Sequence, residues 1–385
     1  MGESYLDNAA TTRVLPEAAE AAADAMLRRW GNPSSNHAPG LEAADLLASC
    51  RKRVSETIGC GRDEVYFTSG GTEANNIAVL GMARAAGKFP NKSGKIVTTE
   101  IEHPSVRDAA AQLEREGFDV ARVRPDRAGN IGPDEFLAAV DEHTVLCAMM
   151  LVNNEVGSIL PVAEAARGVK LISSKTGRKI LFHCDAVQAL GKLPFSADTL
   201  GVDSLSLSAH KIHGAKGTGA LYIRKGTRVR PLIFGGGQQL GFHPGTENMP
   251  GVASFAAALA ALPPIAEAGE HFASINHYAR QKLSEIGGVE IISDERAHPG
   301  ILSFATGCVM SETMLNFLSG RGIYVSGGSA CSKGKRSHVL TACKLPNHII
   351  DSAIRLGFSR FTTKDDIDAL CEGLRDAAAT LAKFK

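Results

Sequence analysis

Short apolar runs that alternate with helical patterns constrain this chain more than any other feature of its sequence. Most of these runs carry apolar residues at successive positions, as expected of strands that are covered on both faces. Helical patterns such as 134–140 separate several of the runs, which is typical of βαβ units. The pattern therefore predicts a parallel sheet flanked by helices. The expected strands are 65–68, 95–99, 145–152, 179–184, 204–208 and 219–223.

The helical patterns begin and end at recognisable residues. Pro16 suits the first position of a helix over 17–29, and an amphipathic pattern ends at Gly59. The character of the sequence changes after Pro250, so we expect a large α/β domain to about residue 255 and a smaller α+β domain after it. The elements expected there are helices over 254–262 and from about 273 to 286, strands 301–304, 322–326 and 353–357, and a C-terminal helix after Thr362 or Thr363.

Composition excludes several classes of function. The chain has 385 residues, of which 44% are hydrophobic and 22% charged, and its formal net charge is +1. The basic residues are scattered along the chain and form no cluster of the kind that binds nucleic acid. The longest apolar runs are shorter than the ~20 residues of a membrane-spanning helix. The 8 cysteines form no CxxC pair, so neither a metal site nor a disulfide framework is expected. The N-terminus has no signal-peptide pattern. We expect a soluble cytoplasmic protein.

One lysine follows an expected strand directly. Lys211 stands after His210, where the apolar run 204–208 ends and a glycine-rich turn begins. In open α/β sheets ligands bind at the carboxyl ends of strands, and a lysine there suits a Schiff base with pyridoxal phosphate. A surface lysine in a glycine turn is the alternative interpretation.

A carboxylate at the end of the preceding expected strand favours the cofactor. Asp185 lies 211 − 185 = 26 residues before Lys211, about the spacing of one βαβ unit. Pyridoxal phosphate needs an acid beside its pyridine nitrogen, because the protonated ring is the electron sink. Asp185 alone could equally be a helix N-cap. With Lys211 one strand later, the cofactor is the better interpretation.

A third strand end has the features of a phosphate cradle. The first expected strand passes through Gly70, Gly71 and Thr72 into a helical pattern. Glycines allow close backbone approach and a helix N-terminus attracts anions, although the stretch matches neither GxGxxG nor the Walker pattern. His103, after the second expected strand, is placed to stack on a flat ring and pass protons. As one histidine among 12, it is weak evidence alone.

Cys331 is the candidate nucleophile. It lies in a glycine- and serine-rich stretch between an expected strand and a helical pattern, and this loop is expected to be mobile. Its basic neighbours Lys333, Lys335 and Arg336 would favour the thiolate over the thiol. The cysteines inside apolar runs, by contrast, are expected to be buried and inert.

These motifs, in their order and spacing, resemble the cysteine desulfurases of aminotransferase fold class V over essentially the whole chain. The matching stretches are YLDNAATT (5–12), GNPSSNH (31–37), TSGGTEANN (68–76), NNEVG (153–157), HCDAVQ (183–188), SAHK (208–211), GTEN (245–248) and GSAC (328–331). The resemblance implies the pyridoxal-phosphate transferase fold type I. A large domain, 13–255, would contain a mostly parallel seven-stranded sheet flanked by helices. Residues 1–12 and 256–385 would form a small α+β domain that carries the catalytic cysteine loop.

The resemblance also implies a role for each matching residue. Lys211 would form the Schiff base, and His103 would stack on the ring and act in catalysis. Asp185 would pair with the pyridine nitrogen, and Gln188 would hydrogen-bond the ring hydroxyl. The residues expected to hold the phosphate are Gly71, Thr72, Ser208 and His210, with Thr246 from the other subunit of a homodimer. Those expected to bind the substrate carboxylate are Asn154, which also contacts the cofactor, and Arg355, whose fork suits bidentate contact.

The implied activity is the conversion of L-cysteine to L-alanine. Lys211 would move the α-proton, and the Cys331 thiolate would attack the substrate sulfur and become a persulfide. The sulfur would then pass to an acceptor protein, such as an iron–sulfur scaffold or a tRNA-thiolation enzyme. No membrane or direct nucleic-acid contact is expected.

Two stretches depart from the QERG and RxGT patterns of many relatives. This chain has QQLG at 238–241 and HPGT at 243–246, so no role at the dimer edge is carried over for the missing Glu and Arg.

Rival interpretations are a selenocysteine lyase, a transaminase and a non-catalytic sulfur-carrier scaffold. Cys331 argues against a transaminase, which needs no such thiol. The retained lysine, aspartate and arginine argue against a scaffold.

Overall fold

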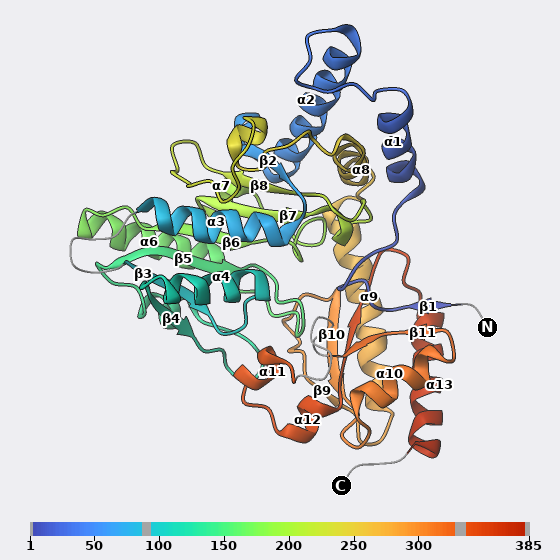
Figure 1. The fold of residues 1–385 in the computed structure, drawn as a ribbon. Coiled ribbons are helices and arrows are strands. Elements are labelled where there is room, and N and C mark those ends of the chain that lie inside the picture. Colours follow the sequence, from blue (N-terminus) through green and yellow to red (C-terminus); the bar gives the residue numbers. More distant parts are fainter. Residues whose placement is uncertain (1–2, 87–93, 328–335, 382–385) are drawn as a thin grey trace.

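A seven-stranded sheet forms the centre of the computed structural model, which describes residues 3–86, 94–327 and 336–381 (Figure 1). Its strands are β2 (Val65–Thr68), β3 (Lys95–Thr99), β4 (Asp119–Val123), β5 (Thr144–Met150), β6 (Leu181–Asp185), β7 (Ser204–Ser208) and β8 (Gly219–Ile223). They lie in the order β2-β8-β7-β6-β5-β3-β4. β8 is antiparallel to both neighbours, and the other neighbouring pairs are parallel. This confirms the predicted α/β fold with a mostly parallel sheet.

Helices cover both faces of this sheet, because successive strand residues point to opposite sides. In β5, Leu146 and Ala148 belong to the core that contains α3 and α4, whereas Cys147 and Met149 belong to the core that contains α5, α6, α7 and α8. Every residue of β5, β6, β7 and β8 is buried, as the continuous apolar runs predict. The helices are α3 (Gly71–Ala86), α4 (Pro104–Arg115), α5 (Pro133–Leu137), α6 (Val162–Thr176), α7 (Ala197–Leu200) and α8 (Met249–Ala260).

Two N-terminal helices pack against α8 at the top of Figure 1. α1 (Pro16–Leu27) has Pro16 at its first position, and α2 (Ala38–Ile58) ends at Gly59, whose φ of 64° is left-handed. Both boundaries agree with the sequence. Short 3-10 helices occur at η1 (Arg62–Glu64), η2 (Ala209–Lys211) and η3 (Gln238–Gly241).

A four-stranded antiparallel sheet lies below the large sheet in Figure 1, in the order β12-β13-β10-β9. A separate two-stranded parallel sheet pairs β1 with β11. Their strands are β1 (Ser4–Tyr5), β9 (Glu290–Ile291), β10 (Ile301–Ala305), β11 (Ile323–Tyr324), β12 (Ser326–Gly327) and β13 (Ala353–Gly357). The nearby helices are α9 (Ile265–Ser284), α10 (Ser311–Ser319), α11 (His338–Ala342), α12 (Asn347–Asp351) and α13 (Lys364–Thr380). The division of the chain into a large domain, 13–255, and a small domain of residues 1–12 and 256–385 remains a prediction.

The structure differs from the expected elements in several regions, including an α8 that begins at Met249 instead of residue 254. α9 begins at Ile265 instead of near 273, because Pro264 occupies its N-cap and ends the preceding turn. β4 is an edge strand whose sequence, DVARV, includes charged residues and forms no apolar run. The expected strand 322–326 divides into β11 and β12, which pair in different sheets.

The N-terminal segment, residues 7–12, connects the two larger sheets. Asp7 forms a bridge with Gly357 at the end of β13, and the Thr12 N–H donates to the His210 carbonyl beside β7 at 2.9 Å. In the described residues, no single helix is long and apolar enough to cross a membrane. α8 and α9 meet such criteria only together, as a pair bent by 81°.

Candidate active site

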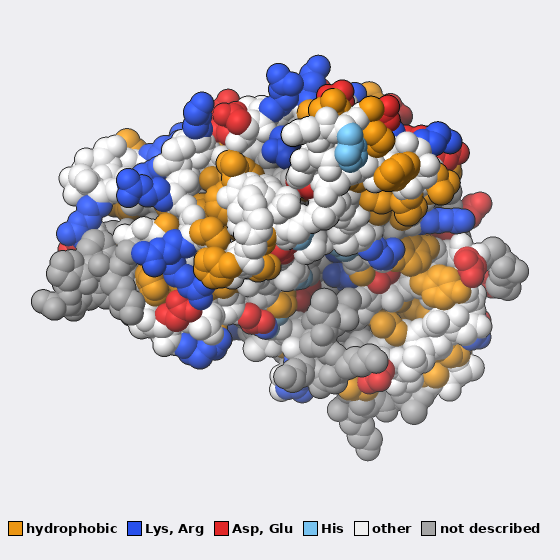
Figure 2. All heavy atoms as spheres, turned by 45° about the horizontal axis from the view of Figure 1, so that its top comes forward, with side chains coloured by type: hydrophobic (Ala, Val, Ile, Leu, Met, Phe, Trp, Pro, Cys, Tyr) orange, Lys and Arg blue, Asp and Glu red, His pale blue; other side chains and the backbone are white. Residues whose placement is uncertain are grey.

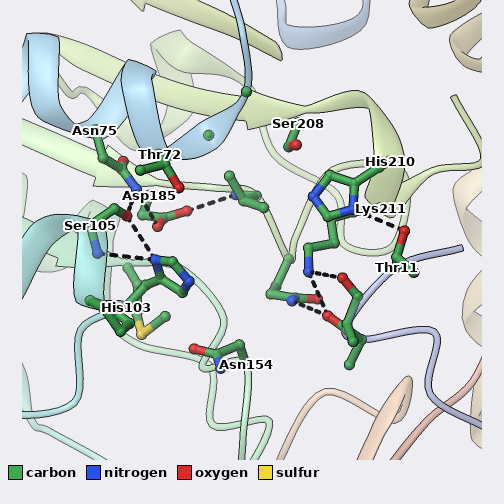
Figure 3. Close-up of a pocket in the computed structure, with 18 of the residues that line it drawn as sticks. Thr11, Thr72, Asn75, His103, Ser105, Asn154, Asp185, Ser208, His210 and Lys211 are labelled. Atoms are coloured by element: carbon green, nitrogen blue, oxygen red, sulfur yellow. Dashed lines mark hydrogen bonds between the residues drawn. The ribbon is translucent and has the colours of Figure 1, made fainter. Parts of the chain in front are cut away.

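A cavity of about 510 Å³ opens at the carboxyl ends of β5, β6 and β7, where ligands bind in open α/β sheets. Side chains from several elements face this space (Figure 3). The cavity brings together the predicted residues Gly71, Thr72, His103, Asn154, Asp185, Gln188, Ser208, His210, Lys211 and Arg355. Thr246 is exposed and does not line it. Cys331 lies outside the described residues.

Lys211 is the last residue of η2, directly after β7. Its Nζ donates hydrogen bonds to the backbone oxygens of Ala9 and Ala10, each at 2.7 Å (Figure 3). Burial, with a smaller contribution from the positive charge of Lys192, lowers the pKa of Lys211 to about 7. The amine therefore has an available lone pair near neutral pH, which an ordinary lysine lacks.

Asp185 ends β6, and a chain of buried hydrogen bonds fixes its carboxylate. Asn75 Nδ2 donates to Oδ2 at 2.8 Å, and the Val187 N–H donates to Oδ1 at 3.0 Å. Asn75 Oδ1 lies 2.9 Å from Nε2 of His183. Burial lowers the pKa of His183 to about 3, so this ring is neutral and its Nε2–H donates to the amide oxygen. The Asp185 carboxylate is therefore held as an acceptor at the cavity wall.

The cradle residues lie where β2 passes into α3. Gly70 has a φ of 150°, and a Cβ on Gly71 would lie 2.6 Å from Cγ2 of Val187, so both positions favour glycine. The Ser208 hydroxyl is buried and has no hydrogen-bond partner among the described residues. The free N–H groups at the start of α3, a helix of 16 residues, are further donors. Together these groups can hold an anion.

Two neutral histidines flank the cavity. His103 caps α4 and accepts at Nδ1 from the Ser105 N–H at 3.2 Å. Burial lowers the pKa of His103, against the opposing effect of Asp185. His210 Nδ1 lies 3.1 Å from the Thr11 hydroxyl, and burial lowers the pKa of His210 to about 4. Both rings can exchange hydrogen bonds without carrying a fixed charge.

Arg355 brings a guanidinium to the cavity from β13. Its Nη1 donates to the Asn154 carbonyl and its Nη2 to Oδ1 of Asp7, both at 2.9 Å. The Arg355 side chain is only 3% exposed, and its Nε has no partner in the described part of the chain. Because a guanidinium has five N–H donors, donors remain for the carboxylate of a ligand.

Several groups that line this cavity are not found from the sequence. The carbonyl groups of Ala9 and Ala10 carry no sequence pattern, since every residue has a carbonyl. Asn75 lies in the stretch 68–76, and its place one helical turn after Gly71 could have marked it as facing the cavity. Glu155 also lines the cavity and accepts a hydrogen bond from Ser337, and burial raises the pKa of Glu155 to about 7.

The structure modifies one expectation about the cysteines. Arg336 donates to Asp351 at 2.7 Å and to Asn347 at 3.0 Å, so its charge is partly neutralised by an acidic partner instead of being free to favour a thiolate. Cys147 and Cys184 are completely buried, as expected. Burial raises the pKa of both thiols, which keeps them unreactive.

The fold and this set of residues agree with a known family. The family model described as aminotransferase class-V matches residues 4–370. The chain belongs to the aminotransferase class-V family.

Relatives within the aminotransferase class-V family are similar along nearly the whole chain. A NifS/IcsS protein homolog of Lactobacillus delbrueckii subsp. bulgaricus is 39% identical over 371 residues, 94% of each chain. The cysteine desulfurase IscS of Dictyoglomus turgidum is 37% identical, over 100% of this chain and 97% of that protein. A solved structure of a NifS-like protein is 37% identical, covers 98% of this chain and 100% of its own, and has a TM-score of 0.91.

Membership of the aminotransferase class-V family implies dependence on pyridoxal phosphate, and the cavity fits this group. The unpartnered Ser208 hydroxyl and the cradle at Gly70 and Gly71 fit a phosphate. The fixed carboxylate of Asp185 fits a protonated ring nitrogen, and the Lys211 amine fits an aldehyde.

The departure at 243–246 creates an ion pair beside the cradle. His243 Nδ1 lies 2.8 Å from Oε1 of Glu73, whose Oε2 accepts from the Ser69 N–H at 2.6 Å. The hydrogen bond to Glu73 raises the pKa of His243, against the opposing effect of burial. The pair therefore stabilises the fold fully below the ordinary histidine pKa of ~6.5 and loses this contribution as pH rises through the raised pKa.

Replacing His243 with asparagine is expected to remove this pH dependence. Between about pH 6 and pH 8.5, the wild-type protein should lose about 0.5–1 kcal/mol of unfolding free energy relative to the variant. Urea unfolding of both proteins at both pH values measures this, and Glu73→Gln is the matched control because it removes the same pair from the other side. An equal stability difference at both pH values would contradict the ion pair.

Proposed function

We propose that this protein is a pyridoxal-phosphate-dependent cysteine desulfurase that converts L-cysteine to L-alanine and leaves the sulfur as a persulfide on Cys331. The observation that carries the proposal is the placement of Lys211, Asp185 and Arg355 around one cavity. They supply an amine for an aldehyde, a carboxylate for a ring nitrogen and a guanidinium for an amino-acid carboxylate. Homology to cysteine desulfurases over nearly the whole chain supports L-cysteine as the substrate.

Different residues around the cavity are proposed to contact different parts of the cofactor. When bound, pyridoxal phosphate supplies an electron sink for the pair released at the substrate Cα. Lys211 would hold it covalently, Asp185 would accept the hydrogen bond of the ring nitrogen, and His103 would stack on the ring. The other cofactor contacts in this proposal are Gly71, Thr72, Asn154, Gln188, Ser208 and His210.

Lys211 also moves a proton. With its Nζ free, Lys211 would accept the proton from the substrate Cα and would later return a proton as alanine forms. A pKa of about 7, lowered by burial, suits a group that must both accept and donate near neutral pH. The neutral ring of His103 is the second proton carrier of the proposal.

Cys331 is the proposed acceptor of the sulfur, on the evidence of the GSAC stretch and of the neighbouring Lys333 and Lys335 in the sequence. Its thiolate attacks the sulfur of the substrate, and a new S–S bond forms as the Cβ–S bond breaks. The electron pair of the broken bond stays on carbon, which takes up a proton. L-cysteine and a protein thiol thus give L-alanine and a protein persulfide without a further reactant.

Replacing Arg355 with lysine is expected to raise the KM for L-cysteine about 10–100-fold with a smaller effect on kcat, because an ammonium group cannot reproduce a bidentate fork that also contacts Asp7 and Asn154. Alanine formation at increasing L-cysteine concentration measures this. Arg360→Lys, which changes a half-buried arginine outside the cavity, is the control. An unchanged KM in Arg355→Lys would remove Arg355 from the substrate site.

A homodimer completes the proposed site. Thr246 would reach the phosphate of the other subunit, and its exposure in the single chain supports such a role. Apolar side chains are exposed in the same stretch of sequence, with Phe234 87% and Leu240 73% exposed. Figure 2 shows that hydrophobic side chains gather in patches on the face that it presents. We propose that the persulfide sulfur passes in the cytoplasm to an iron–sulfur scaffold or a tRNA-thiolation enzyme.

The product test separates this function from its rivals. Protein loaded with pyridoxal phosphate and given L-cysteine and dithiothreitol should form L-alanine and sulfide in equal amounts. A keto acid without sulfide would identify a transaminase. No turnover and no visible absorption band would identify a scaffold. A much higher turnover of L-selenocysteine would identify a selenocysteine lyase.

A further inference from the structure

The N-terminal segment, residues 7–12, has no role in the proposed function, yet all its residues bond to the site or to its supports. The bonds join Asp7 to Arg355, Asn8 to Gly357, Ala9 to Gln188 and Lys211, Ala10 to Lys211, Thr11 to His210, and Thr12 to His210. Two of these contacts are main-chain carbonyl groups that accept hydrogen bonds from the same amine.

The geometry at the Lys211 amine matches a neutral group. A neutral primary amine has two N–H bonds and one lone pair, whereas an ammonium has three donors. The carbonyl groups of Ala9 and Ala10 take both N–H bonds, each at 2.7 Å. Because the nitrogen is tetrahedral, its remaining position points away from both carbonyl groups. That position holds the lone pair of the neutral amine.

The surroundings of Lys211 also favour the neutral amine. Burial lowers the pKa of Lys211 to about 7, the cations Lys192 and Arg355 act in the same direction, and the carboxylates of Asp7 and Asp185 act against them. A large fraction of Lys211 is therefore a neutral amine, able to act as a base, at neutral pH without any conformational change.

We propose that the carbonyl groups of Ala9 and Ala10 orient the free Lys211 amine so that its lone pair faces the substrate Cα, and that Asn8 is the positioning residue that holds these carbonyl groups in place. The inference rests on the proposed function. In the proton transfer that this orientation assists, the substrate Cα–H bond breaks, the proton goes to Lys211 Nζ, and the electron pair stays with the substrate carbon.

Asn8 ties the N-terminal segment to β13. It is 3% exposed, and its Nδ2 donates to the Gly357 carbonyl at 2.9 Å and to the Tyr5 carbonyl at 3.1 Å. A Cβ on Gly357 would lie 2.2 Å from the Ala9 nitrogen, so the segment packs directly on the strand. Removing the Asn8 side-chain amide weakens this tie by two hydrogen bonds, while the Asn8 backbone N–H still donates to the Gly357 carbonyl at 3.1 Å, and it does not touch Lys211 itself.

The first test uses the cofactor-free protein. The pKa of Lys211 is measured by NMR of protein labelled with ¹³C-lysine, with its resonance assigned from Lys211→Arg. In Asn8→Ala, water reaches the amine, and because burial is the main cause of the low pKa, the pKa should rise by about one unit or more. Asn276→Ala is the matched control: it removes a similarly buried amide that donates to the Pro299 carbonyl at 2.9 Å, and should leave the Lys211 pKa unchanged.

The second test measures proton transfer on the loaded enzyme with L-alanine. The Asn8→Ala variant should exchange the α-hydrogen of L-alanine for deuterium at least about 10-fold more slowly than the wild type. This loss is a part of the 10²–10⁴-fold rate increase that a general base contributes. The Kd for L-alanine should stay within about twofold of the wild-type value. Equal exchange rates and equal Lys211 pKa values in Asn8→Ala and wild type would overturn the inference. Absence of exchange in the wild type would instead overturn the proposed function. If Asn8→Ala fails to accumulate, Asn8→Ser should show the same changes to a smaller degree.

Discussion

The Cys331→Ser protein is expected to keep its visible absorption band and to form no persulfide. The described residues that line the cavity already supply the lysine, the aspartate and the cradle that are proposed to hold the cofactor, so we expect cofactor binding not to depend on this thiol. A serine hydroxyl is not ionised near neutral pH and cannot attack the sulfur of the substrate in its place. Turnover to alanine and sulfide should fall by at least about 10²-fold, the smallest loss typical of a missing catalytic group.

Mass spectrometry of the protein after one round of reaction with L-cysteine measures this result. Wild-type protein should gain one sulfur atom on the peptide that contains Cys331, and the variant should gain none. Cys60→Ser is the matched control, because burial raises the pKa of the half-buried Cys60 thiol to about 12 and leaves it a poor nucleophile. Normal production of alanine and sulfide by Cys331→Ser would refute the assignment.

Replacing Lys211 with alanine should lower the turnover of L-cysteine by about 10³-fold or more, because one side chain serves both as the covalent link and as the base. The variant should still bind pyridoxal phosphate through the Ser208 hydroxyl and the cradle at Gly71, which the substitution leaves in place. Borohydride should then fix no ring to the protein.

Peptide mapping after borohydride reduction checks this prediction. In wild-type protein the reduced cofactor should be found at position 211. Lys216→Ala is the control, since Lys216 lines the same cavity and is exposed, and this variant should carry the label at Lys211 as the wild type does. A label at another lysine in the wild type would contradict the proposed site.

The strand ends that carry the site could be predicted because the reactive groups there belong to side chains, whose types can be read from the sequence. Asp185 ends a mostly apolar run, Lys211 follows the stretch SLSLS at 204–208, and neighbouring parallel strands place such ends at one edge of a sheet. The edge strand β4 could not be predicted in the same way, because its exposed positions relax the need for apolar residues.

The interior support of the site was harder to predict. His183 reads as one more residue of a buried strand, and only the fold shows that it reaches the Asp185 carboxylate through Asn75. The carbonyl groups of Ala9 and Ala10 depend on backbone position alone. The side chains proposed to contact the cofactor or the substrate directly could be predicted, whereas the groups that hold those side chains in place needed the three-dimensional structure.

The ion pair between Asp7 and Arg355 joins residues that are 348 positions apart in the chain. When the ribosome has translated the strands through β8, the N-terminal segment can contact Gln188, His210 and Lys211, but β13 and its Arg355 have not yet been made. Contacts this distant in sequence form late, because their loop-closure cost precedes any gain. Completion of the cavity wall at Arg355 must therefore follow synthesis of almost the entire polypeptide instead of guiding its early co-translational folding.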